Sequence, residues 1–355
     1  MDIERRNTRK YNFRRPDLME LMKLASFVDD PKDLRDCFGR LLSLLSTDVE
    51  DGLLFTLVQL LLPIMEEYAY LLGISVSDRF PFNGVEGILE SRVITEVVHL
   101  KKYNVDDNLA IKGGIKGLPS KFLIEKDFSF ANSGSMVAFE AILFLLIYGL
   151  VMFPHIDNFV DVISIRIFLV GNPVPPLFGD TYFSIHHMTY KGGGTIVCCV
   201  PLLYKLFISH LPRSHIFKEN KGCLRWSQKL MSLTNDNITW YSFVYDDVKI
   251  IDSCDEFSNV PLLGIQGGIN YNPALARRQL GFSMKDKPNK TLLESLFFQE
   301  GKDTQGLKAR MDHHPKLIFL HEFGTTSVMP SEGSKPLFMS ISFFFSLGLP
   351  SPISV

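Results

Sequence analysis

Apolar residues recur at spacings of three and four positions along most of the chain, which is the pattern of amphipathic helices. The clearest example starts at Asp30 and Pro31, a capping residue followed by proline in the first turn. Its apolar face is formed by Leu34, Cys37, Phe38, Leu41, Leu42 and Leu45. Strands and helices do not alternate along the sequence, and no internal repeat is visible. The pattern therefore predicts a mainly α, multi-helical globular domain.

Further helices are predicted from apolar runs bounded by proline, glycine or capping residues. Gly73, Gly171 and Gly281 are expected to end three of them, and Asn158 is expected to cap another. A small extended part is predicted at residues 238–252, where aromatic and β-branched residues gather, and residues 264–272 are predicted as a loop. The predicted helices lie near residues 16–25, 53–62, 66–72, 85–100, 120–128, 158–169, 175–191, 195–211, 224–233 and 273–280.

The run at residues 136–153 is long and apolar enough to be mistaken for a membrane span. Its one charged residue is Glu140, and an ionisable group at that depth is costly in lipid. No Lys or Arg lies close to either end to set an orientation. The run also begins after a capping sequence and stops at Pro154, as an ordinary helix does. It is predicted to be a buried core helix, with a single membrane span as the alternative.

Composition and charge narrow the class of protein. The 355 residues are 46% hydrophobic and 21% charged, which is typical of a globular chain, and the net charge is −2. Five cysteines without regular spacing argue against a disulfide framework, and the adjacent Cys198 and Cys199 are predicted to be reduced and buried. With no apolar signal segment at the N-terminus, these features predict an intracellular protein of the nucleus or cytoplasm that is not secreted.

The first fifteen residues are predicted to form a basic, flexible arm with a local charge of +4. Such an arm can neutralise phosphates or serve as a nuclear import signal, and the alternative is a solvated terminus without a partner. The predicted contacts to nucleic acid or to a nuclear protein are Arg5, Arg6, Arg9, Lys10, Arg14 and Arg15.

Residues 16–310 are predicted to form one domain because no linker divides them, whereas residues 311–355 have a different composition. The 45 residues of this tail include five charged ones, against ten in the 29 residues before it. The tail is rich in Ser, Pro and Phe and has no helical period. It is predicted to be a non-domain tail, either disordered or of non-native coding, with a strand-forming extension as the alternative.

Several residue groups invite a chemical interpretation, but none has the spacing that the chemistry requires. The glycines after Lys191 come in the wrong order for a phosphate-binding P-loop and predict a turn. His186, His187 and the cysteines lack the paired spacing of a zinc site, and no nucleophile elbow or catalytic cysteine context is present. The serines around Gly134 are predicted to cap a helix rather than hold an anion. No catalytic, cofactor or metal site is therefore predicted.

Five segments of the chain have distinctive sequences: EEYAYLLG at 66–73, LIYGL at 146–150, GTIVCCVPLLYK at 194–205, FSNVPLLG at 257–264 and NPALARRQLG at 272–281. Together they resemble an uncharacterised plant domain family, common in legumes and related to the plant mobile domain. The motif residues of unknown role are Tyr68, Tyr70, Gly73, Arg277, Arg278, Gln279 and Gly281. The resemblance covers most of residues 1–310 and implies a helical domain of transposable-element lineage.

The resemblance also implies two departures from the family pattern. Relatives carry an aromatic, strand-like stretch between the elements at 55–59 and 66–68, where this chain has residues 60–65 alone. Relatives continue after residue 311 into a basic helix with a tryptophan, where this chain has its tail. An internal piece is therefore predicted to be missing near residues 60–65.

Three functions remain open from the sequence. The first is a non-enzymatic interaction module of mobile-element origin, in the nucleus or associated with nucleic acid. The second is an enzyme with an unrecognised site, suggested by the aminotransferase-like label that the wider family carries and by no residue pattern here. The third is a membrane protein with its span at residues 136–153.

Overall fold

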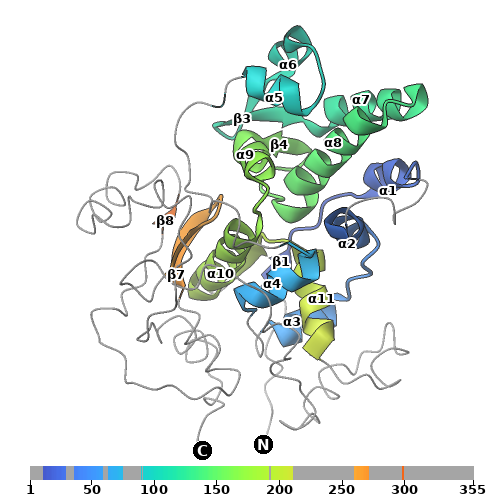
Figure 1. The fold of residues 1–355 in the computed structure, drawn as a ribbon. Coiled ribbons are helices and arrows are strands. Elements are labelled where there is room, and N and C mark those ends of the chain that lie inside the picture. The colour runs from blue at the N-terminus through green and yellow to red at the C-terminus, as the bar shows by residue number, and fades with distance from the viewer. Residues whose placement is uncertain are drawn as a thin grey trace, which may run out of the picture.

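The structure of the chain is a computed structural model that describes residues 11–28, 36–58, 63–74, 89, 91–191, 193–210, 260–271 and 298–299. It is mainly helical with a few short strands, so the predicted fold class is confirmed (Figure 1). The helices are α1 (Met19–Ala25), α2 (Asp36–Leu45), α3 (Asp51–Leu57), α4 (Met65–Leu72), α5 (Ser91–Val97), α6 (Lys102–Asn108), α7 (Ser120–Ser133), α8 (Met136–Ile147), the π-helix η1 (Tyr148–Met152), α9 (Val162–Val170), α10 (Val174–Lys191) and α11 (Val200–His210).

The described strands pair in three small sheets. In the first, β1 (Tyr11–Phe13) runs parallel to β5 (Gly194–Ile196). The second is antiparallel in the order β2 (Ala110–Lys112), β3 (Ile115–Pro119) and β4 (Phe159–Asp161). The third is antiparallel in the order β6 (Val260–Leu263), β7 (Gly267–Tyr271) and β8 (Phe298–Gln299). Each sheet is too small to stand alone and depends on packing against helices.

Helix ends follow local chemistry where the sequence carried a clear signal. Gly73 and Gly171 end α4 and α9 in the left-handed conformation, with φ of 64° and 70°, as predicted. The cap of α9 differs from the prediction. Asp161, not Asn158, accepts hydrogen bonds from the first turn of α9, because β4 occupies the residues between them. The helix predicted at 120–128 is also longer than expected and continues as α7 to Ser133.

From Ala138 onward the apolar run at residues 136–153 packs in the core, as predicted, whereas Met136 and Val137 at its start are exposed. It divides into α8 and η1, and the side chains of Phe139, Leu143 and Leu146 are fully buried. Around it α8 packs against α7, α1, α2 and α9. Among the described residues, no helix combines the length and the apolar character that a membrane crossing requires.

Two expectations about extended structure have different outcomes. The loop predicted at residues 264–272 is wrong for most of its length, because Gly267–Tyr271 is strand β7 and pairs with β6. Glycines there favoured a loop, whereas pairing with β6 and packing on α10 stabilise the strand. The extended part predicted at 238–252 lies outside the described residues, as do the helices predicted at 224–233 and 273–280.

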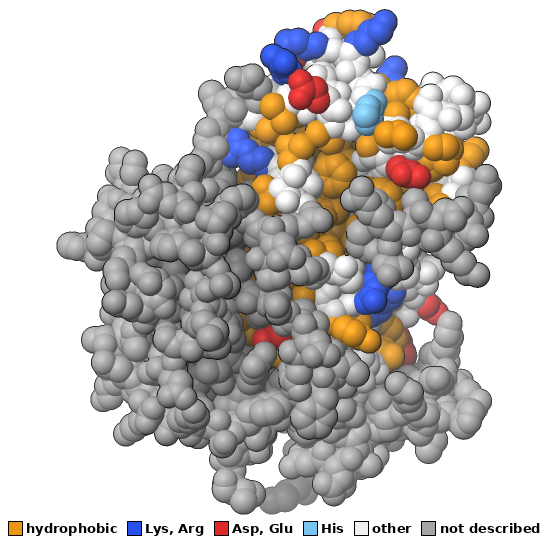
Figure 2. All heavy atoms as spheres, viewed as in Figure 1, with side chains coloured by type: hydrophobic (Ala, Val, Ile, Leu, Met, Phe, Trp, Pro, Cys, Tyr) orange, Lys and Arg blue, Asp and Glu red, His pale blue; other side chains and the backbone are white. Residues whose placement is uncertain are grey.

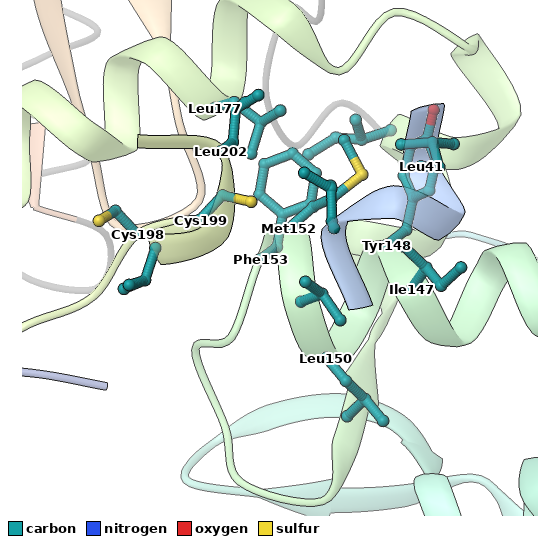
Figure 3. Packing of buried hydrophobic residues seen from close by; sticks show 14 of the residues in the cluster. Leu41, Ile147, Tyr148, Leu150, Met152, Phe153, Leu177, Cys198, Cys199 and Leu202 are labelled. Carbon is teal, nitrogen blue, oxygen red and sulfur yellow. The ribbon is translucent and has the colours of Figure 1, made fainter. Parts of the chain in front are cut away.

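The helix α10 connects the parts of the core. It packs against α4, against β5 and against the β6 and β7 strands (Figure 1). Next to it, Cys198 and Cys199 are buried free thiols, as predicted. The close view shows their side chains pointing in opposite directions, with Cys199 directed toward Leu177 and Leu202 (Figure 3).

Candidate functional site

The basic arm predicted at residues 1–15 is described from Tyr11 onward, and this part belongs to the fold instead of being flexible. Arg14 donates to the backbone oxygens of Pro154 and His155. Arg15 donates to the backbone oxygen of Val49 and pairs with Asp51. The guanidinium groups of both arginines therefore have partners within the chain. Arg5, Arg6, Arg9 and Lys10 lie outside the described residues.

The described family-motif residues have structural roles. Tyr68 is fully buried, its hydroxyl lies 3.3 Å from Thr181 Oγ1, and its ring meets that of Phe178 edge to face. Tyr70 is 39% exposed and holds Arg40, whose guanidinium carbon lies 5.5 Å from the ring centre. Gly73 is the helix end described above. Arg277, Arg278, Gln279 and Gly281 lie outside the described residues.

Polar side chains gather in the core around α4, α10 and α11, where no sequence motif had indicated a site. The most direct contact joins Glu67 of α4 to His210 of α11, with 2.7 Å between Oε1 and Nε2. Both side chains are buried. The other carboxylate oxygen of Glu67 accepts from the backbone N–H of Ile64 at 2.9 Å, which caps α4. We refer to the whole group as the core polar network: Glu67, Tyr68, His155, Asp161, Asp180, Thr181, Tyr182 and His210.

His155 lies between two buried aspartates at the turn after η1. Its Nε2 atom is 3.3 Å from Asp180 Oδ2, and its Nδ1 atom is 4.0 Å from Asp161 Oδ2. Burial alone lowers the pKa of His155, but the two carboxylates, Asp180 more strongly, raise it above the ordinary value. Because Arg14 binds the backbone oxygen of the same histidine, strand β1 is fixed to this turn.

Each aspartate of the core polar network also accepts hydrogen bonds that order the backbone. Asp161 Oδ1 accepts from the N–H groups of Ile163 and Ser164, at 2.9 and 2.8 Å. Asp180 Oδ1 accepts from the N–H of Gln266 at 2.9 Å, and the Gln266 amide in turn donates to the Val197 oxygen. The two carboxylates thus connect α9, α10 and the β6–β7 hairpin.

The thiols beside the core polar network and the phenols within it are poor nucleophiles at neutral pH. Burial raises the pKa of Cys199 to about 12 and that of Cys198 well above its ordinary value. Burial likewise raises the pKa of Tyr68 and Tyr182. A protonated, buried thiol does not attack electrophiles readily. Among the described residues, no group of three or more His, Cys, Asp or Glu is arranged to hold a metal ion.

One buried carboxyl group lies apart from the network. Asp127 of α7 is fully buried, and neither of its oxygens has a hydrogen-bond partner in the described part of the chain. Burial raises its pKa to about 8, so the group is mainly protonated at neutral pH. Asp127 therefore adds little negative charge to the surface of α7.

The end of the molecule formed by α5, α6 and the β2–β3 hairpin carries a surplus of positive charge. Residues 91–119, which form these elements, contain five Lys and Arg against three Asp and Glu, a charge of +2, whereas the whole chain has a charge of −2. Figure 2 shows Lys and Arg side chains gathered at this end. This surface is not evident from the sequence, because acidic residues lie between the lysines along the chain.

Within the described residues, the ion pairs at this end involve Arg92, Lys102 and Lys121 and do not include Lys101, Lys112 or Lys116. Arg92 pairs with Glu96, and Lys121 with Glu125, each one helical turn apart. Lys102 pairs with Asp106, whose pKa is lowered by that hydrogen bond and, to a lesser extent, by the charge of Lys116. We call the exposed residues Lys101, Lys102, Lys112 and Lys116 the lysine surface.

The comparison with protein families gave one match. A family model described as a domain of unknown function, DUF7745, matches residues 21–325. The chain belongs to the DUF7745 family. The DUF7745 match contains the described helices from α2 onward, the core polar network and the lysine surface. It also continues fifteen residues past the domain boundary predicted at residue 310. The comparisons with curated proteins and with solved structures gave no match.

Proposed function

We propose that this DUF7745 protein is a non-enzymatic interaction module that binds nucleic acid in the nucleus. The observation that carries the proposal is the charge asymmetry, because a net charge of +2 lies at one end of a chain whose total charge is −2. A positive surface on a chain without overall positive charge favours one orientation toward a polyanion. Lysines at such a surface bind phosphates and release condensed counterions.

The core polar network supports a structural rather than a catalytic use of the buried acids. The oxygens of Glu67, Asp161 and Asp180 accept backbone N–H groups that cap helices or fix the β6–β7 hairpin. Catalytic carboxylates, by contrast, need access to a substrate within hydrogen-bond reach. The raised thiol pKa of Cys198 and Cys199 also argues against covalent catalysis at this place in the core.

The N-terminal residues have a supporting part in this proposal. Arg14 and Arg15 bind within the fold, so they act in its stability. The basic residues before them, Arg5, Arg6, Arg9 and Lys10, are proposed as the import signal and as an auxiliary phosphate contact. The relation to the plant mobile domain and the mobile-element origin belong to the same proposal. They rest on the sequence resemblance and agree with a nuclear role.

The test is binding of the full chain to fluorescently labelled duplex DNA, followed by anisotropy over a series of salt concentrations. Affinity is expected to fall linearly with salt on a double logarithmic scale, by about 0.9 in slope for each phosphate neutralised. The double variant Lys101→Gln/Lys116→Gln is expected to reduce the slope by about 2.

The matched control is Lys23→Gln/Lys191→Gln, which removes the same charge from exposed lysines of α1 and α10. It is expected to leave the slope within about 0.5 of the wild-type value. An equal reduction of the salt slope in the two double variants would show that the net charge of the chain, and not the lysine surface, determines DNA binding. No detectable binding to any nucleic acid at low salt would overturn the proposed function.

A further inference from the structure

The β2–β3 hairpin extends past the third strand of its sheet. Strand β4 pairs with Gly117, Leu118 and Pro119 of β3 and not with the residues before them. The segment from Ile111 to Lys116 therefore forms a two-stranded ribbon that β4 does not flank. Its turn consists of Gly113 and Gly114, both with positive φ. Among the described residues, no other group lies within 4 Å of the position that a Cβ would take on either glycine. The tip is consequently narrow and open.

The ribbon presents a cation on each of its faces. Ile111 is paired with Lys116 and Lys112 with Ile115, and residues paired across two strands share a face. Lys112 and Lys116 thus leave opposite faces, and both are exposed. Ile111 is 75% exposed and shares its face with Lys116. Lys112 also donates to the backbone oxygen of Asp157 at 2.6 Å, which holds the ribbon against the body.

We infer that this ribbon enters the major groove of a DNA duplex. The face that carries Ile111 and Lys116 lies toward the base edges, while Lys112 on the opposite face keeps its contact with Asp157. The inference rests on the proposed function and specifies its ligand. The major groove is about 12 Å wide and admits a two-stranded ribbon, whereas the minor groove is about 6 Å wide. Strands lie about 4.8 Å apart before side chains are added, so the ribbon does not fit the minor groove.

Single-stranded nucleic acid fits this surface less well. Its binding relies on aromatic side chains on which bases stack. Tyr103 is the exposed aromatic residue of α6, and it stands one helical turn from Asp106 and Asp107, whose charges repel phosphates. Duplex RNA is also disfavoured, because its major groove is deep and too narrow for side chains to read.

The experiment compares three ligands of the same sequence and about 20 nucleotides per strand: duplex DNA, single-stranded DNA and duplex RNA. With the full chain at about 0.1 M salt, duplex DNA is expected to bind at least about 5-fold more tightly than the others. The variant Ile111→Ala is expected to weaken duplex DNA binding about 5-fold without changing the salt slope, because no cation is lost. The control Val137→Ala removes a similarly exposed aliphatic side chain from α8 and is expected to have no effect.

Groove choice is read out separately by protection of guanine N7 from methylation and by competition with a minor-groove ligand such as netropsin. The bound protein is expected to protect guanine N7 from methylation, and netropsin is expected not to displace it. Equal binding of single and double strands, an inert Ile111→Ala variant, or displacement by netropsin would each overturn the ribbon inference. In those cases a reduced salt slope in Lys101→Gln/Lys116→Gln would still uphold the proposed function. Absence of all nucleic-acid binding would overturn both.

Discussion

Glu67 and His210 meet in the core although 143 positions separate them in the sequence, with 2.7 Å between Glu67 Oε1 and His210 Nε2. The contact joins α4 to α11 within the core. Because Glu67 also caps α4, one carboxylate fixes both the start of a helix and its packing partner. A buried polar pair of this kind is costly to break from one side, since the remaining group loses its partner.

We therefore expect Glu67→Gln and His210→Gln each to lower the free energy of unfolding by about 3 kcal/mol. The double variant is expected to lose at least about 1 kcal/mol less than the sum of the two, because the second change removes a group that the first left unpaired. Urea denaturation followed by circular dichroism measures all four free energies. Additive losses would mean that the two side chains stabilise the fold independently.

The helices of this fold were predictable because their signal is local. The apolar face of α2, the glycine ends of α4 and α9 and the prolines that open α10 all act within one or two turns. The strand β7 was not predictable, because Gly267 and Gly268 favour a loop until β6 lies beside them. Local propensity is weaker for strands, whose stability comes from their neighbours.

The polar groups of the core were missed for a similar reason. A single acid such as Asp180 in a helical pattern, or a single histidine such as His155 after a proline, carries no spacing signal. Only the packing of α10 against neighbouring segments brings them within 3.3 Å. The lysine surface likewise depends on α6 lying beside the β2–β3 hairpin, since in the sequence its cations alternate with acids.

Asp127 is expected to make stability fall as the pH rises. Its pKa is about 8 in the folded chain and near 4 when the chain is unfolded, so between these values the folded state holds a proton that the unfolded state has released. The contribution of Asp127 to the free energy of unfolding therefore declines by about 1.4 kcal/mol per pH unit from about pH 4 to pH 8. This contribution is fully present only below pH 4.

The variant Asp127→Asn cannot ionise at this position. Its free energy of unfolding, relative to that of the wild-type chain, is therefore expected to rise by at least about 2 kcal/mol between pH 5 and pH 8. Chemical denaturation at four pH values in this range measures the difference. The control is Gly52→Ala, which changes no titratable group. Its free energy of unfolding is expected to differ from that of the wild-type chain by the same amount at every pH. A constant difference for Asp127→Asn as well would show that this carboxyl group is ionised in the folded chain.

The thiols of Cys198 and Cys199 are expected to resist alkylation in the folded chain. Both are buried, and their raised pKa leaves little thiolate at about pH 8. After treatment with iodoacetamide, mass spectrometry should find the peptide that carries both cysteines unmodified. The same peptide should be labelled after unfolding in guanidinium chloride. Rapid labelling in the folded chain would instead indicate an accessible nucleophile and favour an enzymatic role.

Substitution by alanine is expected to change the free energy of unfolding in opposite directions at two glycines, Gly117 and Gly52. A Cβ on Gly117 of β3 would lie 2.3 Å from the backbone oxygen of Val160 and 2.8 Å from the Cα of Asp161, and backbone atoms of a paired strand cannot move aside alone. Gly117→Ala is therefore expected to destabilise the fold by about 3 kcal/mol. Gly52 lies in α3, where the nearest atom to an added Cβ is 4.0 Å away.

Gly52→Ala is consequently expected to raise the free energy of unfolding by about 0.5 to 1 kcal/mol, because alanine restricts the unfolded chain and favours the helix. Urea denaturation of the two variants beside the wild-type chain measures both effects with one chemical change, a single methyl group. A tolerated alanine at position 117 would mean that β3 and β4 separate at little cost. The β2–β3 ribbon would then lack the rigid base that its insertion into a groove requires.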